Sequence, residues 1–348
     1  MMESILYVGT DQGVAVARSR DNGSWQIAER GLRKWEVTEL AVSPQSPNKV
    51  FAGTRGDGVW VSEDFGKTWV KPSYGRRGPG KVRSVTIDPH EPRRLYAGCE
   101  PIDVFVSEDE GKTWFRLDTV RELPFIDSIT YPLARVEPHV RDVSVDPENP
   151  DALYVALQLG YIIKSVDRGR SWTLLDNALD CDVHVVLIEP AAPRRLTAAT
   201  GGHGSRRGEA PGRALYFSDD AGASWTPTAM NFEQDYCVPL VRDPHDPNRL
   251  YSSLASGTAG RWHKRDSGAE AVMVRSQNGG RTWDAAGKGI DAREYPEAIV
   301  VDAAHPGRLH VGCRNGDFYT SEDAGDSWRP LNLGLKIDDL SSLALTQA

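Results

Sequence analysis

Residues 62–69 read SEDFGKTW, and this pattern of Ser, Asp, Gly, a hydroxyl residue and Trp returns along the whole chain. The copy at 276–283 has Asn in place of Asp, and the first copy is one residue short. Successive copies begin at intervals that run from 43 residues (19 to 62) to 58 residues (107 to 165), which indicates one repeated supersecondary unit. The copies occupy residues 19–25, 62–69, 107–114, 165–172, 218–225, 276–283 and 321–328.

Between the copies, apolar and polar residues alternate in short runs that are typical of β-strands. Residues 82–98, VRSVTIDPHEPRRLYAG, contain one such run, a turn marked by prolines and a second run. No segment has a long 3.6-residue apolar period, so few helices are expected. At about 150 residues per domain the length alone suggests two domains. Seven repeats of this size instead predict an all-β protein, a single seven-bladed β-propeller of four-stranded antiparallel blades that spans residues 1–348.

The repeated octapeptide has the chemistry of a tight turn followed by an apolar anchor. Ser and Asp side chains accept hydrogen bonds from backbone N–H groups nearby, and Gly supplies a positive φ. Trp buries a large surface, so we expect it to pack between neighbouring sheets with its N–H bonded to a carbonyl. The aspartates of the repeat are therefore interpreted as turn formers and not as catalytic carboxylates.

The two ends of the chain are expected to share one blade. Residues 5–9 resemble the second strand of a blade, with no first strand before them. Residues 339–346 match first strands elsewhere, with no blade after them. We therefore predict that the C-terminal strand pairs into the N-terminal blade and closes the ring, which removes exposed sheet edges.

Composition limits the partners and the compartment. The chain has 41 Lys and Arg against 49 Asp and Glu, a net charge of −8, so there is no basic excess for a nucleic-acid partner. No apolar stretch approaches the length of a membrane span, and the first residues lack the features of a secretion signal. Four cysteines are too few for a disulfide scaffold. The expectation is a cytoplasmic protein that binds neither nucleic acid nor membrane.

The octapeptides resemble the Asp-box, or BNR, repeat of sialidases, sortilin-type receptors, xyloglucan-degrading glycosidases and the photosystem II assembly factor. This resemblance implies a β-propeller with each box in the turn between the third and fourth strands. The chain departs from sialidases, which are six-bladed and carry an early Arg-Ile-Pro-type motif. It also departs from the xyloglucan-degrading enzymes, which place their acids between two propellers. Because these families differ in function, the box implies a fold and no activity.

The long loops are predicted to gather on the face opposite the box turns. They are residues 117–138, 201–213, 226–236 and 256–269. Long loops on one rim of a rigid scaffold are where binding sites are expected. Two rings of residues from the innermost strands should surround the channel mouth on this face. The first ring is Thr38, Arg83, Arg141, His184, Val238, Glu297 and Ser341, and the second, two residues earlier, is Glu36, Lys81, His139, Asp182, Tyr236, Tyr295 and Asp339.

These rings contain the candidate site. Arg83 and Arg141 are suited to holding a carboxylate, sulfate or phosphate through paired hydrogen bonds. The candidate catalytic acids, bases and nucleophiles are Glu297, Tyr295, Tyr236, His184 and Asp182. The candidate ligand-binding residues are Arg83, Arg141, His139, Lys81, Glu36, Trp262 and His263. The alternative interpretation is that these polar groups line a wet channel and pair with each other.

Two further features leave alternatives open. Trp262, in the loop RWHKRD at 261–266, could stack on a sugar, or it could cap a hydrophobic gap. No cofactor is expected, although a divalent metal is an alternative because several histidines point to the same face. Its ligands would be His139, His184, His203, His263 and Asp182.

The rings and the long loops lead to two candidate functions. The first is a glycosidase-like hydrolase or lyase acting on a small acidic ligand, such as a sugar that bears a carboxylate, in a pocket on the long-loop face. The second is a propeller without catalytic activity that binds a protein partner on the same face.

Overall fold

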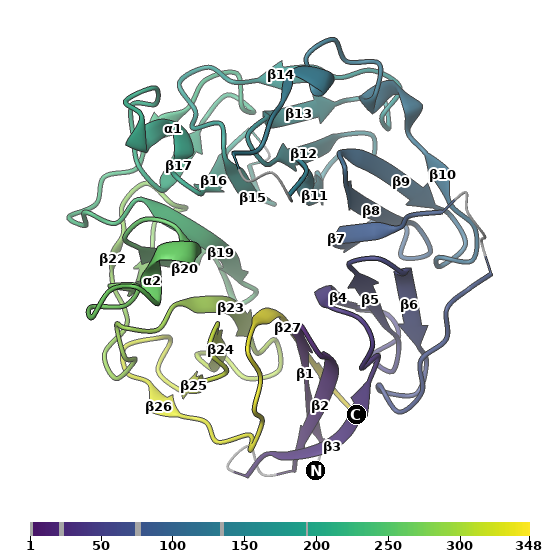
Figure 1. Ribbon diagram of the computed structural model, residues 1–348, viewed down its shortest axis with the longest axis vertical. Helices are drawn as coiled ribbons and strands as arrows, with labels where there is room; N and C mark the ends of the chain where they lie inside the picture. The colour runs from purple at the N-terminus through teal and green to yellow at the C-terminus, as the bar shows by residue number, and fades with distance from the viewer. Residues whose placement is uncertain (1–2, 21–23, 74–77, 133–135, 193) are drawn as a thin grey trace.

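The computed structural model describes residues 3–20, 24–73, 78–132, 136–192 and 194–348. Seven antiparallel sheets lie radially around a common axis (Figure 1). Their innermost strands pack beside one another in a closed series around this axis. The predicted all-β, seven-bladed propeller is confirmed.

The blades are numbered from the N-terminus, and each is given from its inner to its outer strand. Blade 1 contains β27 (Leu340–Gln347), β1 (Ser4–Thr10), β2 (Gly13–Ser19) and β3 (Gln26–Gly31). Blade 2 contains β4 (Val37–Val42), β5 (Val50–Thr54) and β6 (Gly58–Ser62). Blade 3 contains β7 (Lys81–Ile87), β8 (Leu95–Glu100), β9 (Asp103–Ser107) and β10 (Phe115–Arg116). Blade 4 contains β11 (Val140–Val145), β12 (Leu153–Leu157), β13 (Tyr161–Ser165) and β14 (Thr173–Leu175).

The remaining blades follow the same order. Blade 5 contains β15 (Val183–Ile188), β16 (Leu196–Thr200), β17 (Leu215–Ser218) and β18 (Thr226–Pro227). Blade 6 contains β19 (Tyr236–Asp243), β20 (Asp246–Ala255), β21 (Val272–Ser276) and β22 (Asp284–Ala285). Blade 7 contains β23 (Pro296–Val301), β24 (Leu309–Cys313), β25 (Phe318–Ser321) and β26 (Arg329–Pro330). The helical turns are η2 (Asp118–Val120), η3 (Ile126–Ser128), α1 (His203–Arg206) and α2 (Ala259–Trp262), and none in the described ranges is long and apolar enough to cross a membrane.

Blade 2 departs from the predicted four strands. Its fourth strand is reduced to a single bridge, in which Val61 and Val70 exchange hydrogen bonds of 2.9 and 2.8 Å. The fourth strands of blades 3, 5, 6 and 7 are also short, with two residues each. Short outer strands limit edge-to-edge association of the blades with other molecules.

The ring is closed by the last strand, as predicted. β27 pairs antiparallel with β1, from Ser4 opposite Gln347 to Thr10 opposite Leu340. The amide of Glu3 also donates to the carbonyl of Ala348 at 3.1 Å. Blade 1 therefore contains both ends of the chain.

Each box closes the turn between the third strand and the outermost segment of its blade. In the copy at 62–69, the Ser62 hydroxyl donates to Asp64 (2.8 Å) and accepts from the amide of Gly66 (2.8 Å). The amide and hydroxyl of Thr68 both donate to Asp64, at 2.9 and 2.6 Å. The same bonds recur at Asp109, Asp167, Asp220 and Asp323, and Asn278 accepts the equivalent amide hydrogen bond at 3.0 Å.

The box tryptophans pack between blades. Trp114 of blade 3 lies in a cluster with Phe51 and Val59 of blade 2, and Trp283 of blade 6 lies with Leu215 of blade 5. The expected N–H bond to a carbonyl is present in only some copies. It is made by Trp114, Trp283 and Trp328, whereas Trp172 donates to the Thr119 hydroxyl and Trp25, Trp69 and Trp225 have no partner among the described residues. Apolar burial, and not the N–H bond, is therefore what the copies share.

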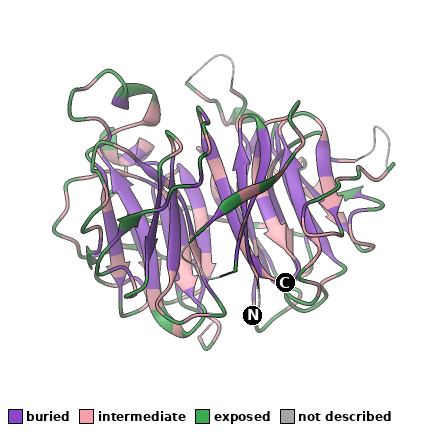
Figure 2. Ribbon diagram, turned by 90° about the horizontal axis from the view of Figure 1, so that it is seen from below, coloured by how far each residue is buried: buried purple, intermediate pink, exposed green. Residues whose placement is uncertain are grey.

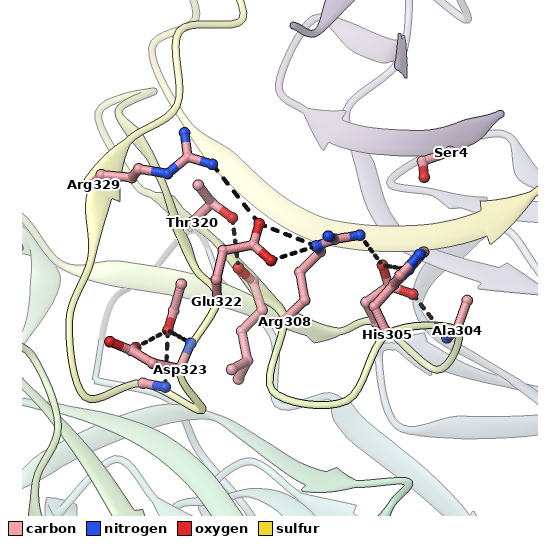
Figure 3. A network of polar contacts seen from close by, with 12 residues as sticks. Ser4, Ala304, His305, Arg308, Thr320, Glu322, Asp323 and Arg329 are labelled. Carbon is pink, nitrogen blue, oxygen red and sulfur yellow. Dashed lines mark hydrogen bonds and ion pairs between the residues drawn. The ribbon is translucent and has the colours of Figure 1, made fainter. Parts of the chain in front are cut away.

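Ion pairs on the box face connect several boxes to the turn between the first two strands of the same blade, as Figure 3 shows for blade 7. In blade 7, Asp302 accepts a hydrogen bond from the Ala304 amide at 2.8 Å, and Arg308 lies 3.4 Å from the same carboxylate. Arg308 also pairs with Glu322 of the last box at 2.9 Å. Blade 3 repeats this arrangement in Asp88, Arg94 and Glu108. Charges on this face hold turns together.

Removal of residues 339–348 should leave the edge of β1 unpaired and open the ring. We expect this truncated protein to unfold or aggregate, as measured by far-UV circular dichroism and size-exclusion chromatography. A control that lacks only Ala348 should remain soluble. A soluble truncation of unchanged stability would contradict ring closure by β27.

The boxes should contribute stability that is lost in acid. Hydrogen bonds from the Ser327 side chain and amide lower the pKa of Asp323 to about 2. Since this pKa lies below its usual value, the contribution is present above about pH 4 and is lost as the pH falls toward 2. Asp323→Asn should cost about 1 kcal/mol at pH 7, because it removes a charge-assisted acceptor. Urea denaturation at pH 7, 4, 3 and 2.5 should show this difference shrinking, and a difference that does not change with pH would contradict the assignment.

Candidate functional site

The candidate site lies where the inner strands begin. Figure 2 shows loops projecting from one face of the ring, while both chain ends lie toward the other face. The first residues of the inner strands, the ends of the second strands and these loops form what we call the upper mouth. Its position follows from the alternation of strand direction within each blade, since the box turns lie at the opposite ends of the strands.

A β-bulge occurs at the first predicted ring in the inner strands. The pairing register shifts around Thr38, Arg83, Arg141, His184 and Glu297. In blade 6 the shift spans Val238 and Pro239, and in blade 1 it falls at Ser341. A bulge leaves one residue outside the ladder and re-aims its side chain. The residues aligned from sequence therefore occupy equivalent places in the structure.

Several members of the first ring bind the next blade. The Thr38 hydroxyl donates to the carbonyl of Val82 at 2.8 Å, and the Ser341 hydroxyl donates to that of Val37. His184 Nδ1 lies 2.6 Å from the carbonyl of Cys237. These side chains join neighbouring inner strands.

Arg83 is neutralised by a residue outside both predicted rings. Its guanidinium binds Glu100 at the end of β8, with Nε 2.8 Å from the carboxylate. The Glu100 side chain is only 1% exposed and also lies 3.4 Å from Arg55 and 3.7 Å from Lys81. Arg55 in turn pairs with Glu36 at 3.4 Å. The predicted joint capture of a ligand by Arg83 and Arg141 is therefore corrected, because Arg83 already has a buried counter-ion.

Arg141 is different from Arg83. Its side chain makes no hydrogen bond or ion pair with any residue in the described ranges, although the residue is partly buried. Its charge acts to lower the pKa of Glu297 and of Asp182, and it also opposes protonation of His139. Arg141 is thus a cation without an ion pair among the described residues, and its charge acts on two carboxyl groups.

The second-strand ends explain this difference. In each of these blades, the residue at or just after the end of the second strand lies beside the ring residues of the inner strand. In blade 4, for example, the Gln158 amide donates to the carbonyl of His139, a residue of the second ring, at 2.9 Å. Blade 3 places Glu100 beside Arg83, and blade 7 places Arg314 beside Glu297. Blade 4 has the neutral Gln158 at the position equivalent to Glu100. This third set of positions was missed from sequence, although the same repeat alignment identifies it.

Glu297 lies in an ion-pair group at the start of β23. Arg314 lies 3.3 Å from Glu297 and 2.8 Å from Asp339. The Glu297 side chain is 11% exposed. Burial raises the pKa of Glu297 despite the nearby charges of Arg314 and Arg141. The protonated form of this carboxyl is therefore favoured more than usual.

Asp182 shows the opposite shift. Burial opposes its ionisation, but the charges of His184 and Arg141 hold the pKa of Asp182 below its usual range. His184 Nε2 lies 3.5 Å from Asp182 Oδ1, while His184 Nδ1 faces a carbonyl, which can only accept a hydrogen bond. A Cβ added at Gly201 would lie 2.2 Å from Asp182 Oδ2, so a glycine is required there.

Aromatic residues form a cap beside the mouth. The Tyr295 hydroxyl accepts from the Val238 amide at 2.7 Å and lies 3.3 Å from the Ser253 carbonyl, so its polar group is occupied by backbone. Trp262 is 6% exposed, and its ring centroid lies 4.7 Å from that of Tyr295. The hydrophobic-cap interpretation of Trp262 is therefore right, and its ring is not presented for stacking. Tyr236 remains partly buried, with its ring 5.5 Å from that of His184.

Two of the predicted ligand-binding residues, Lys81 and His263, are exposed, and the predicted metal ligands do not form a metal site. Lys81 is exposed and pairs with Glu137 at 3.3 Å, and His263 is exposed after α2. No group of three or more His, Cys, Asp or Glu side chains within the described ranges is arranged to hold a metal ion.

Two more carboxyls, on the inner strands just after the bulges, were not predicted from sequence. Burial raises the pKa of Glu39 to about 7 and that of Asp142 to about 6. Glu39 accepts a hydrogen bond from the Ser342 hydroxyl at 2.9 Å, and Asp142 accepts one from the Val186 amide at 3.1 Å. Each carboxyl therefore connects two neighbouring blades.

Comparison with known proteins agrees with this architecture. A family model described as the BNR-Asp box repeat matches residues 59–71. The chain is a seven-bladed β-propeller that contains Asp-box repeats. It is 33% identical over 206 residues to a probable oligoxyloglucan-reducing end-specific xyloglucanase of Neosartorya fischeri, a match that covers 53% of this chain and 23% of that relative. The Asp-box propeller thus spans less than a quarter of this curated relative's length.

Solved structures with the same fold include two kinds of protein. The GH74 xyloglucanase from Xanthomonas campestris is 19% identical with a TM-score of 0.63, over 85% of this chain and 45% of that one. A structure described as YCF48 bound to D1 peptide is 15% identical with a TM-score of 0.57, over 90% of this chain and 88% of that one. At these identities the structures share the fold alone.

The two ring arginines should behave differently when replaced. Arg83→Gln leaves the buried Glu100 without its closest partner, and breaking a buried pair costs roughly 3–5 kcal/mol. Because Arg55 and Lys81 remain near Glu100, we expect a loss of about 2 kcal/mol. Arg141→Gln breaks no ion pair and should change stability by less than about 0.5 kcal/mol. Urea denaturation at pH 7 measures both changes, and equal losses would contradict the assigned pairing.

Proposed function

We propose that this propeller is a hydrolase or lyase of the glycosidase type, acting on a small acidic ligand bound at the upper mouth. The proposal rests on one observation. The guanidinium of Arg141, which has no ion pair among the described residues, acts on two carboxyls whose pKa values move in opposite directions, Glu297 upward and Asp182 downward. Pairs of titratable groups separated in this way are the usual signature of acid and base roles.

Each residue then has a defined role. Arg141 binds the carboxylate of the ligand through paired hydrogen bonds. Glu297, in its protonated form, donates a proton to the leaving oxygen as the glycosidic bond breaks. Asp182, as the carboxylate, removes a proton from the attacking water in a hydrolase, or from a ring carbon in a lyase. His184 holds Asp182 in place.

The relatives support a carbohydrate ligand. Two of the proteins described above carry the name xyloglucanase, one matched by sequence and one by structure. The acidic character of the ligand is inferred from Arg141, and not from these relatives.

A second candidate is a propeller without catalytic activity that binds a protein segment on the long-loop face. The structure of YCF48 bound to D1 peptide favours this candidate, because that chain shares the fold over most of its length. Hydrogen bonds hold the loop after β16 against the residues that precede β15. Asp180, which is fully buried, accepts hydrogen bonds from the amides of Gly204 (3.2 Å) and Ser205 (2.7 Å) at the start of α1.

Turnover of nitrophenyl glycosides of uronic acids and of neutral sugars tests the enzyme proposal. We expect cleavage of the uronic-acid substrates, with kcat lowered about 10²–10⁴-fold in Glu297→Gln, the range of general acid catalysis. Arg141→Ala should lose activity toward acidic substrates, while Arg213→Ala, on the same face, should not. An absorbing unsaturated product would indicate a lyase. No turnover of any substrate, together with binding of peptides, would favour the second candidate.

A further inference from the structure

The wall of the upper mouth beside Arg141 contains three buried polar atoms without hydrogen bonds. His139 Nε2, Gln158 Oε1 and Asp182 Oδ1 make none with any residue that the structure describes, and the nearest approach is that of His184 Nε2 to Asp182 Oδ1 at 3.5 Å. The three residues are 2%, 7% and 7% exposed. Buried polar atoms are normally hydrogen-bonded, so three together call for an explanation.

His139 presents an acceptor to this wall. Its Nδ1 lies 3.0 Å from the carbonyl of Glu137, which can only accept, so Nδ1 carries the proton. Burial, with the charges of Arg83 and Arg141, holds the pKa of His139 well below its usual range. The ring is therefore neutral, and its Nε2 is a bare acceptor.

Gln158 and Asp182 also present acceptors. The Gln158 amide nitrogen donates to the Tyr131 hydroxyl at 3.3 Å, which leaves its Oε1 as the free atom. Burial and the Asp182 carboxylate raise the pKa of Tyr131, while Arg141 opposes this shift. Tyr131, Asp182 and Arg141 thus lie within electrostatic reach of one another. Gln158 follows β12 of blade 4, Asp182 precedes β15 of blade 5, and Tyr131 lies in the loop between β10 and β11.

The wall therefore combines three acceptors with one cationic donor. A neutral sugar would supply hydroxyl donors but no anion for Arg141. An aliphatic carboxylate would supply the anion but leave the acceptors unsatisfied. Of these three ligand classes, only one with both kinds of group supplies partners to the acceptors and to Arg141.

We propose that this wall is a subsite for a polyhydroxylated carboxylate, that is, a sugar acid. Its carboxylate binds Arg141, and its hydroxyls donate to His139 Nε2, Gln158 Oε1 and Asp182 Oδ1. This inference rests on the acidic ligand of the proposed function, but it does not require turnover. It adds Gln158 and Tyr131 to the site and names the chemical class of the ligand.

Titration calorimetry with three probes of similar size tests the subsite. D-glucuronate has both groups, D-glucose has the hydroxyls, and cyclohexanecarboxylate has the carboxylate. We expect the wild-type protein to bind glucuronate at least tenfold more tightly than either of the others. Gln158→Leu should weaken glucuronate about tenfold and leave cyclohexanecarboxylate unchanged, whereas Arg141→Gln should weaken both acids. Gln234→Leu, a matched change on the same face, should alter neither.

The outcomes separate the subsite from the enzyme. Equal wild-type affinity for glucuronate and cyclohexanecarboxylate would overturn the subsite and indicate water in the wall, and this comparison needs no variant. Unchanged glucuronate binding in a folded Gln158→Leu protein would also overturn it. Tight glucuronate binding without cleavage of glucuronate glycosides would support the subsite and contradict the proposed enzymatic activity. Cleavage of neutral glycosides without glucuronate binding would overturn the subsite and show a glycosidase that does not require an acidic ligand.

Discussion

Packing of each box tryptophan between its own blade and the preceding blade is the interaction on which the ring depends. A single four-stranded sheet cannot cover both of its faces, and the apolar clusters of this protein each draw residues from two successive blades. The Ser and Asp of the box hold the turn that presents the tryptophan. Blade stability is therefore shared between neighbours, and the rigid ring that results holds the inner strands at fixed distances from one another.

The bulges of the inner strands allow different side chains to occupy equivalent positions of this ring. Because the bulged residue lies outside the ladder, its side chain can change without a change in strand register. Small members such as Thr38 and Ser341 bind the next blade, while the large charged members reach the mouth. The face with the box turns has the opposite character, since its charged groups, such as Arg94 and Arg308, are paired with acids of the same blade.

The sequence predicted most of the fold, because the boxes and the alternating runs report local turn and strand chemistry. It also predicted which positions of the inner strands are equivalent, since the repeat alignment places the bulged residue of each strand in one set. It did not predict which of these side chains already form ion pairs within the protein. The state of Arg83 depends on Glu100, which lies 17 positions away and is brought beside it by strand pairing. The difference between Trp262 as a cap and as a stacking surface depends on how a loop folds onto Tyr295, which has no periodic signal. The short fourth strand of blade 2 could not be predicted either, because the box sequence does not indicate how long the following strand is.

Blade 1 imposes an order on folding that the other six blades do not. The contact between β1 and β27 joins residues near opposite ends of the chain, and such non-local contacts form slowly because loop-closure entropy opposes them. During synthesis, β1 keeps an unpaired edge until residues 340–347 have left the ribosome, even when every other blade is complete. The nascent protein is therefore most prone to wrong association at β1, the first strand to be synthesised. This period ends only when β27 pairs with β1.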